Sequence, residues 1–258
     1  SKKEILLTTY ICHPSMANNE LSGPAVLTHL TLKILSNKKR NYSYRIIFIP
    51  ETIGSIVYIK KNFDALKKNT IAGFVITCVG DDGHFSYLES RYGNTLADHS
   101  AKLILKYYTK KYKKYSFLDR GSDERQFCSP NVDLPVCSIM KSKHGKFKEY
   151  HTSLDNLDFI SPKALDDSLK IFDKIISLLE INFNYKSKYL CEPQMSKRNL
   201  YPTIGKNRKD YNTKKIMDIL AYCDGSNDII KLSEILSINP FEINDFINIL
   251  LKEKLIYK

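Results

Sequence analysis

Tyr10-Ile-Cys-His-Pro-Ser-Met-Ala-Asn-Asn-Glu-Leu-Ser-Gly23 joins a predicted strand to a predicted helix. Before this stretch, residues 4–11 form a short apolar run rich in Ile, Leu and Thr, which is typical of a buried strand. After it, apolar residues recur at helical spacing over residues 23–35. His13 is therefore expected at the carboxyl end of a strand, which is the edge where open α/β sheets bind ligands.

The rest of the first 181 residues continues this alternation of strands and helices. The sequence predicts strands at 45–49, 71–79, 85–90 and 134–140, and helices ending at residue 63 and spanning 97–115 and 162–179. Crossover-length connections between strands favour an α/β fold, with a doubly wound, mostly parallel sheet covered by helices on both faces. Because a central strand rarely opens such a domain, we expect further elements before residue 1.

The C-terminal part of the chain has a different pattern. Residues 182–212 lack periodic hydrophobic residues and are predicted to be a linker or a strap over the surface. Residues 213–258 are predicted to form a winged-helix-like module. Its parts are helices at 213–223 and 229–236, a third helix that begins at Pro240 after the cap Asn239, and a strand-like tail at 254–257.

Composition restricts the class of protein. Of the 258 residues, 43% are hydrophobic, which is enough for a core, and no apolar run is long enough to span a membrane. No signal peptide precedes the first strand. The six cysteines include no CxxC pair, so we expect reduced thiols in a cytoplasmic protein rather than a disulfide framework.

The net charge of +12 raises the question of nucleic-acid binding. Residues 209–258 hold seven lysines and eight acidic residues, so this segment is near −1 and the positive excess lies in the first domain. A winged helix that reads DNA needs Lys or Arg against phosphate, and the third helix offers a nearly neutral face. We therefore predict no nucleic-acid partner. An exposed Ile249 instead favours a packing module and a possible homo-oligomer.

Four short stretches carry groups that can bind metal or act as acids and bases. They contain His13, Glu51, Asp123 and His151 respectively. Zinc takes imidazole and carboxylate ligands, and a carboxylate that is not a ligand can accept a proton from water. Each residue alone is a weak signal, because Asp123 could be a helix cap and His151 a structural loop histidine.

The four stretches in this order resemble the zinc aminopeptidases that have a doubly wound α/β domain and two co-catalytic metals. The resemblance rests on residues 19–23 (Asn-Glu-Leu-Ser-Gly), 121–123 (Gly-Ser-Asp) and 151–155 (His-Thr-Ser-Leu-Asp). It is strongest to a bacterial branch with a C-terminal winged helix, associated with surface-polysaccharide gene clusters. Residues 12–15, 50–54, 90–95 and 150–153 are similar to that branch.

The resemblance implies that His13 and Asp123 bind one zinc ion, that His151 belongs to the second metal, and that Glu51 is the general base. Two positions depart from the family pattern. The bridging Asp falls at Asn19, which makes Asn19 a doubtful ligand, and the carboxylate after the base falls at Thr52. One zinc on His13, Asp123 and His151 is therefore favoured over two.

We accordingly expect a zinc-dependent, aminopeptidase-like hydrolase of a peptide or amide bond. Arg91, Tyr92 and Asn94 are candidates for positioning the substrate. The alternative is a protein that keeps the fold without peptidase activity and acts on, or binds, a sugar precursor or a protein partner in surface-polysaccharide biosynthesis. A transcription regulator is disfavoured by the charge of the winged helix.

Overall fold

The computed structural model describes residues 1–198 and 211–258. It divides into two compact units, Ser1–Glu180 and Ile181–Lys258. All the residues predicted for catalysis, metal binding and substrate positioning lie in the first unit, and the predicted winged helix lies in the second. No helix in the described ranges is long and apolar enough to cross a membrane.

The first unit contains a six-stranded sheet with the strand order β2-β1-β3-β6-β4-β5. Its strands are β1 (Glu4–Tyr10), β2 (Ser43–Ile49), β3 (Thr70–Ile76), β4 (Phe85–Leu88), β5 (Tyr112–Tyr115) and β6 (Val136–Met140). Neighbouring strands run parallel except for β4 and β6, which pair antiparallel. The prediction of a mostly parallel sheet is confirmed.

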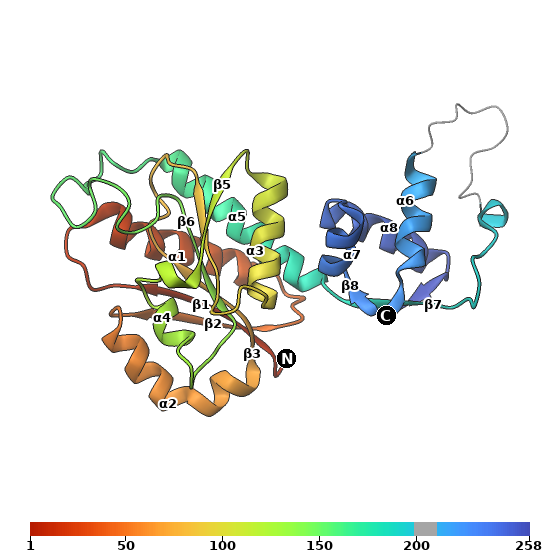
Figure 1. The fold of residues 1–258 in the computed structure, drawn as a ribbon, viewed down its shortest axis with the longest axis horizontal. Helices are drawn as coiled ribbons and strands as arrows, with labels where there is room; N and C mark the ends of the chain where they lie inside the picture. Colours follow the sequence, from red (N-terminus) through yellow and green to blue (C-terminus); the bar gives the residue numbers. More distant parts are fainter. Residues whose placement is uncertain (199–210) are drawn as a thin grey trace. The chain divides into compact units, whose positions relative to one another are not determined.

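Helices cover both faces of this sheet. They are α1 (Ser22–Ser36), α2 (Ile53–Asn69), α3 (Leu96–Tyr108), α4 (Glu124–Phe127) and α5 (Pro162–Ile181). Helices α2 and α4 lie on one face, and α1, α3 and α5 lie on the other (Figure 1). On the α2 face, Ile59 and Leu66 pack against Leu6, Val75 and Val136 of the sheet. Burial on both faces explains why the central strands β1, β3 and β6 are mostly apolar runs.

The predicted helix over residues 97–115 is wrong in its last seven residues. Helix α3 ends at Tyr108, and Tyr112–Tyr115 forms β5, which pairs in parallel with β4. The segment Tyr112-Lys-Lys-Tyr115 has high strand propensity at its ends and lysines that suit an exposed sheet edge. The tertiary pairing with β4 therefore overrides the helical periodicity that extends from α3.

Gly23 allows α1 to approach the sheet closely. A Cβ atom at this position would lie 2.5 Å from the carbonyl oxygen of Ile76 and would also clash with the hydroxyl of Thr9. Ile76 contributes backbone, which cannot move aside as a flexible side chain can. The start of α1, and with it the loop that carries His13, is thus set by the absence of a side chain at residue 23.

We expect Gly23→Ala to lower the free energy of unfolding by about 1–3 kcal/mol, because the added methyl group overpacks the contact between α1 and β3. The measurement is chemical denaturation followed by far-UV circular dichroism. Leu32→Ala, at a position 58% exposed on the same helix, is the control and should change stability by less than about 0.5 kcal/mol. Equal stability of Gly23→Ala and the native chain would contradict this close approach.

The second unit holds a three-stranded sheet with the order β8-β7-β9 and three α-helices within the described residues. Its elements are β7 (Asn184–Ser187), a 3-10 turn (Met195–Arg198), α6 (Tyr211–Ala221), β8 (Asp224–Asp228), α7 (Ile229–Leu236), α8 (Pro240–Lys252) and β9 (Ile256–Tyr257). Asn239 caps α8 through its side chain, as predicted. The prediction of a linker or strap over residues 182–212 is wrong at Asn184–Ser187, because these residues form β7 of this sheet. Residues 199–210 of that segment lie outside the described residues.

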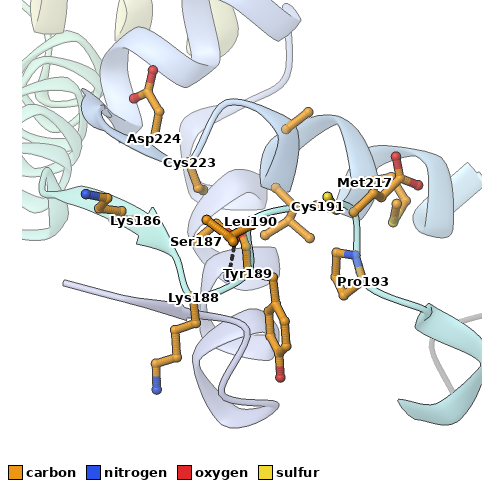
Figure 2. Close-up of a pocket in the computed structure, with 13 residues that line it drawn as sticks. Lys186, Ser187, Lys188, Tyr189, Leu190, Cys191, Pro193, Met217, Cys223 and Asp224 are labelled. Atoms are coloured by element: carbon orange, nitrogen blue, oxygen red, sulfur yellow. Dashed lines mark hydrogen bonds between the residues drawn. The ribbon is translucent and has the colours of Figure 1, made fainter.

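A pocket of about 490 Å³ opens in the second unit between the chain after β7 and helix α6 (Figure 2). Leu190, Pro193 and Met217 supply apolar surface, while Lys186 and Asp224 supply charge. None of the residues predicted for chemistry lines this pocket. The residues predicted for metal binding and catalysis lie in the first unit instead.

Candidate functional site

The predicted ligand His13 and the predicted base Glu51 follow neighbouring strands. β1 ends at Tyr10 and β2 ends at Ile49, and the two strands pair in parallel. Their carboxyl ends therefore open at the same edge of the sheet. The His13 Nε2 atom lies 3.7 Å from the Glu51 Oε2 atom. The sheet thus brings these two side chains together, as the sequence predicts.

Glu20 fixes the orientation of the His13 ring. Between β1 and α1 the chain forms a single π-helical turn (Ala17–Leu21), which buries Glu20. One Glu20 oxygen accepts a hydrogen bond of 2.9 Å from the backbone N–H of His13 and lies 3.1 Å from its Nδ1 atom. A carboxylate on Nδ1 favours the tautomer with hydrogen there, so Nε2 keeps a lone pair that can bind a metal.

His151 reaches the same place from the long loop between β6 and α5. Its ring centroid lies 5.0 Å from that of His13, and Tyr150 stacks on it at 4.0 Å. Asp155 ties this loop to the π-helical turn, because its carboxylate accepts bonds from the backbone N–H groups of Asn18 and Asn19. Two imidazoles that are distant in the sequence therefore face each other at the sheet edge.

Asp123 has one satisfied and one unsatisfied carboxylate oxygen. Oδ1 accepts a 2.8 Å bond from the backbone N–H of Thr52 and lies 2.9 Å from the Ser55 hydroxyl. Oδ2 is buried and has no hydrogen-bond partner within the described residues. Burial raises the pKa of the Asp123 carboxyl to about 6. A buried carboxylate oxygen without a partner is a group that a cation would stabilise.

Thr52 positions that carboxylate through its backbone. It has a left-handed conformation, with φ at +63°, immediately before α2. Its N–H points to Asp123, and its hydroxyl accepts a bond of 2.5 Å from Arg125. The residue at the position of the family's second carboxylate therefore holds the predicted ligand Asp123 in place, although its side chain is a poor ligand itself.

Asn19 is held by groups of the protein core. Its Oδ1 atom accepts a 2.9 Å bond from the Tyr10 hydroxyl, and the Tyr10 hydroxyl in turn accepts a bond from Thr77. The Nδ2 atom of Asn19 is buried without a partner in the described part of the chain. An amide N–H group is a donor and cannot bind a cation. This arrangement favours one metal over two.

The donor groups of the site suit zinc. Two imidazoles and a carboxylate, from His13, His151 and Asp123, are its common ligands. A second combination is closer in space: Cys12, His13 and Glu20 are the one set of three in residues 1–198 and 211–258 whose ligand atoms all lie within 4.8 Å of one another. Burial raises the pKa of the Cys12 thiol, which keeps it protonated and weakens it as a ligand.

The structure places the predicted substrate-positioning residues in a separate set of contacts. Arg91 Nε lies 3.2 Å from Asp133, and Arg91 donates a bond to the hydroxyl of Tyr92, whose ring it also covers. Tyr92 is largely exposed. Within the described residues, Arg91 and Tyr92 make no hydrogen bond, ion pair or ring contact with His13, Glu51 or His151. The role of Arg91, Tyr92 and Asn94 stays a prediction.

Sequence reasoning missed the residues that hold the site together. Glu20 orients His13, and Asp155 fixes the loop of His151. Asp81, in the chain after β3, is buried and accepts bonds from the Asn18 side chain and from Ser142. Glu20 and Asp155 belong to the motifs that carry the resemblance, so their positions were a usable signal.

Comparisons with known proteins agree with this fold. The family model described as "Domain of unknown function (DUF4910)" matches residues 1–182, and a winged helix-turn-helix model matches residues 184–258. A Clostridium acetobutylicum protein is 43% identical over 235 residues, which are 90% of this chain. Its name assigns it, provisionally, to polysaccharide biosynthesis and gives it an aminopeptidase-like domain.

Two solved structures are also similar. One, a provisionally assigned peptidase from Clostridium acetobutylicum, is 38% identical, with a TM-score of 0.89 over 99% of this chain and 57% of that one. A zinc aminopeptidase from Bacillus subtilis has a TM-score of 0.57 and 15% identity, over 67% of this chain and 45% of that one. The latter shows the fold alone. This chain spans 53% of the curated relative's length.

Proposed function

Since this chain belongs to the DUF4910 family over residues 1–182 and has an aminopeptidase-like fold there, we propose that its first unit is a zinc-dependent hydrolase of peptide or amide bonds. The observation that carries this proposal is the meeting of His13 Nε2 and Glu51 Oε2 at 3.7 Å, beside the ring of His151. The Oδ2 atom of Asp123, which is buried and has no partner within the described residues, is a further group that a bound cation would stabilise.

We infer that His13, Asp123 and His151 would hold one zinc ion. Bound zinc lowers the pKa of a water molecule and polarises a carbonyl group. Glu20 keeps Nδ1 of His13 occupied, and Thr52 and Ser55 keep one oxygen of Asp123 occupied, so His13 and Asp123 each have one atom left for the metal. This arrangement also limits the ways in which the ligands can rotate.

Glu51 is the proposed general base. Its carboxylate accepts a proton from the attacking water while the water oxygen bonds to the carbonyl carbon of the substrate. The same carboxylate then passes that proton to the leaving nitrogen as the C–N bond breaks, which leaves a carboxylic acid and an amine. The Glu51 side chain is 19% exposed and its carboxylate lies 3.7 Å from His13 Nε2, so a water molecule can reach it.

In the alternative function, the chain does not hydrolyse peptides. It either catalyses an amide or acyl reaction on a sugar precursor, or binds a sugar precursor or a protein partner. Asn19 and Thr52 favour it, because both stand where the family pattern has carboxylates and a second metal would lack ligands. The name of the curated relative, which places that protein in polysaccharide biosynthesis, is consistent with it.

Hydrolysis assays on the zinc-loaded chain test the proposal. The substrates are a panel of aminoacyl-4-nitroanilides and a panel of N-acetylated amino sugars, each with and without the chelator 1,10-phenanthroline. We expect release of amine that the chelator abolishes and added zinc restores. Activity on the sugars alone would favour the alternative. Activity that is insensitive to chelation, or none on either panel, would contradict a zinc hydrolase.

A further inference from the structure

Six of the fourteen residues that line a pocket in the first unit are lysines. The pocket has a volume of about 460 Å³ and lies among the loop before β4, the chain that follows α3, the end of β6 and one face of α5. Its lysines are Lys110, Lys111, Lys141, Lys163, Lys170 and Lys174. Asp82 and Asp167 are the acidic residues in its lining, so the pocket has a clear positive excess.

Lys141 is the strongest indication that the pocket binds an anion, because this lysine is only 6% exposed. Its Nζ atom lies 4.3 Å from the centre of the Phe85 ring. Its backbone N–H donates to the carbonyl of Cys78, but its side chain makes no hydrogen bond or ion pair within the described residues. A lysine side chain that is largely removed from water and has no anion in contact with its ammonium group is costly to keep in a fold. Burial lowers the pKa of this lysine accordingly. An anion in the pocket would remove that cost.

The other lysines of the pocket include three from α5. Lys163, Lys170 and Lys174 are spaced seven and four residues apart on α5, which places them on one face of the helix. Lys174 lies 4.0 Å from the centre of the Tyr108 ring. Lys163 pairs with Asp167 and Lys170 pairs with Asp166, but these are exposed contacts of small energetic value that can rearrange.

We propose that this lysine pocket binds the phosphate groups of a phosphorylated small molecule. Several ammonium groups that converge on one space match a multiply charged anion better than a single carboxylate, and lysine binds phosphate as a point charge. The volume suits a small molecule, whereas a nucleic-acid strand would need a groove that follows its backbone over several nucleotides. The site does not depend on the proposed hydrolase function.

Asp81 links the chain beside the pocket to the chain beside the candidate metal site. Ser142, directly after Lys141, donates its backbone N–H and its hydroxyl to the two oxygens of Asp81. Asp81 also accepts a 2.9 Å bond from the side chain of Asn18, next to Asn19. A variant test must therefore separate anion binding in the pocket from any effect at His13.

Titration calorimetry with inorganic pyrophosphate at fixed ionic strength tests this proposal. We expect one pyrophosphate per chain, bound about tenfold or more weakly by the double variant Lys110→Ala/Lys111→Ala and by Lys141→Met. The matched control is Lys60→Ala/Lys61→Ala, which removes two exposed lysines from α2 and should change affinity by less than about twofold. His13→Ala should bind pyrophosphate like the native chain.

Several results would overturn the proposal. They are no binding at millimolar pyrophosphate, an equal loss in the α2 control, or a loss in His13→Ala, which would place the anion on the metal site. Tighter binding of a 12-nucleotide single strand, with the same sensitivity to the lysine variants, would identify a nucleic-acid surface instead. Because Lys110 and Lys111 are exposed, their double variant stays informative if Lys141→Met fails to fold.

Discussion

Glu51→Gln is expected to lower the turnover of amide hydrolysis by about 10²–10⁴-fold while the chain keeps its zinc. The amide side chain has nearly the same size as the carboxylate but cannot accept a proton from water. Glu51 is not in the proposed ligand set, and its carboxylate approaches His13 only at 3.7 Å. Loss of the base should therefore leave metal binding and folding close to those of the native chain.

The measurement is kcat for the best substrate of the panel, together with zinc content by elemental analysis on the same sample. Asp64→Asn is the matched control, because it removes one negative charge from the exposed side of α2, the helix that begins just after Glu51. Its kcat should stay within about twofold of the native value. A Glu51→Gln chain with native kcat would show that another group takes the proton.

The meeting of His13 and Glu51 could be predicted because it depends on a general rule. Both residues follow short apolar runs, and the carboxyl ends of neighbouring parallel strands open at one edge of a sheet. The strands β1 and β2 do pair in parallel. The order of strands further along is not given by such local patterns, and neither is the antiparallel pairing of β4 with β6.

Asp123 shows where sequence reasoning leaves two possibilities open. An Asp before a short helix can be a cap or a ligand, and both fit the local sequence. In the structure Asp123 is the N-cap residue of α4 by position, but its side chain makes no capping bond. It turns instead to the N–H of Thr52, a residue distant in the sequence. Only the tertiary structure decides between these possibilities.

The motif around Glu20 marks its position as one to examine, but its contact with His13 could not be predicted from the sequence because that contact depends on an irregular turn. The apolar pattern after His13 predicts a regular α-helix. It does not indicate the π-helical turn that the structure has at Ala17–Leu21. This geometry buries Glu20 and brings its carboxylate to both the backbone and the ring of His13. Such turns are frequent at functional sites, and the backbone of this segment is consistent with that pattern.

The zinc content of ligand variants is the second large effect that we expect. The native chain should bind one zinc ion, and His13→Ala should weaken zinc binding by more than about 100-fold, because loss of a ligand exceeds the 10–100-fold effect of losing a supporting residue. The measurement is zinc per chain after dialysis, with a competition titration for affinity. Two tightly bound zinc ions per native chain would contradict a single site.

His13 belongs to both possible ligand sets, so His13→Ala alone cannot distinguish them. Asp123→Asn and Cys12→Ser can. With the site on His13, Asp123 and His151, Asp123→Asn should lose zinc and Cys12→Ser should keep it. The opposite result would place the metal on Cys12, His13 and Glu20, the more compact set. In that case Nε2 of His13 would remain beside Glu51 without a metal, and the proposed route to hydrolysis would lose its zinc.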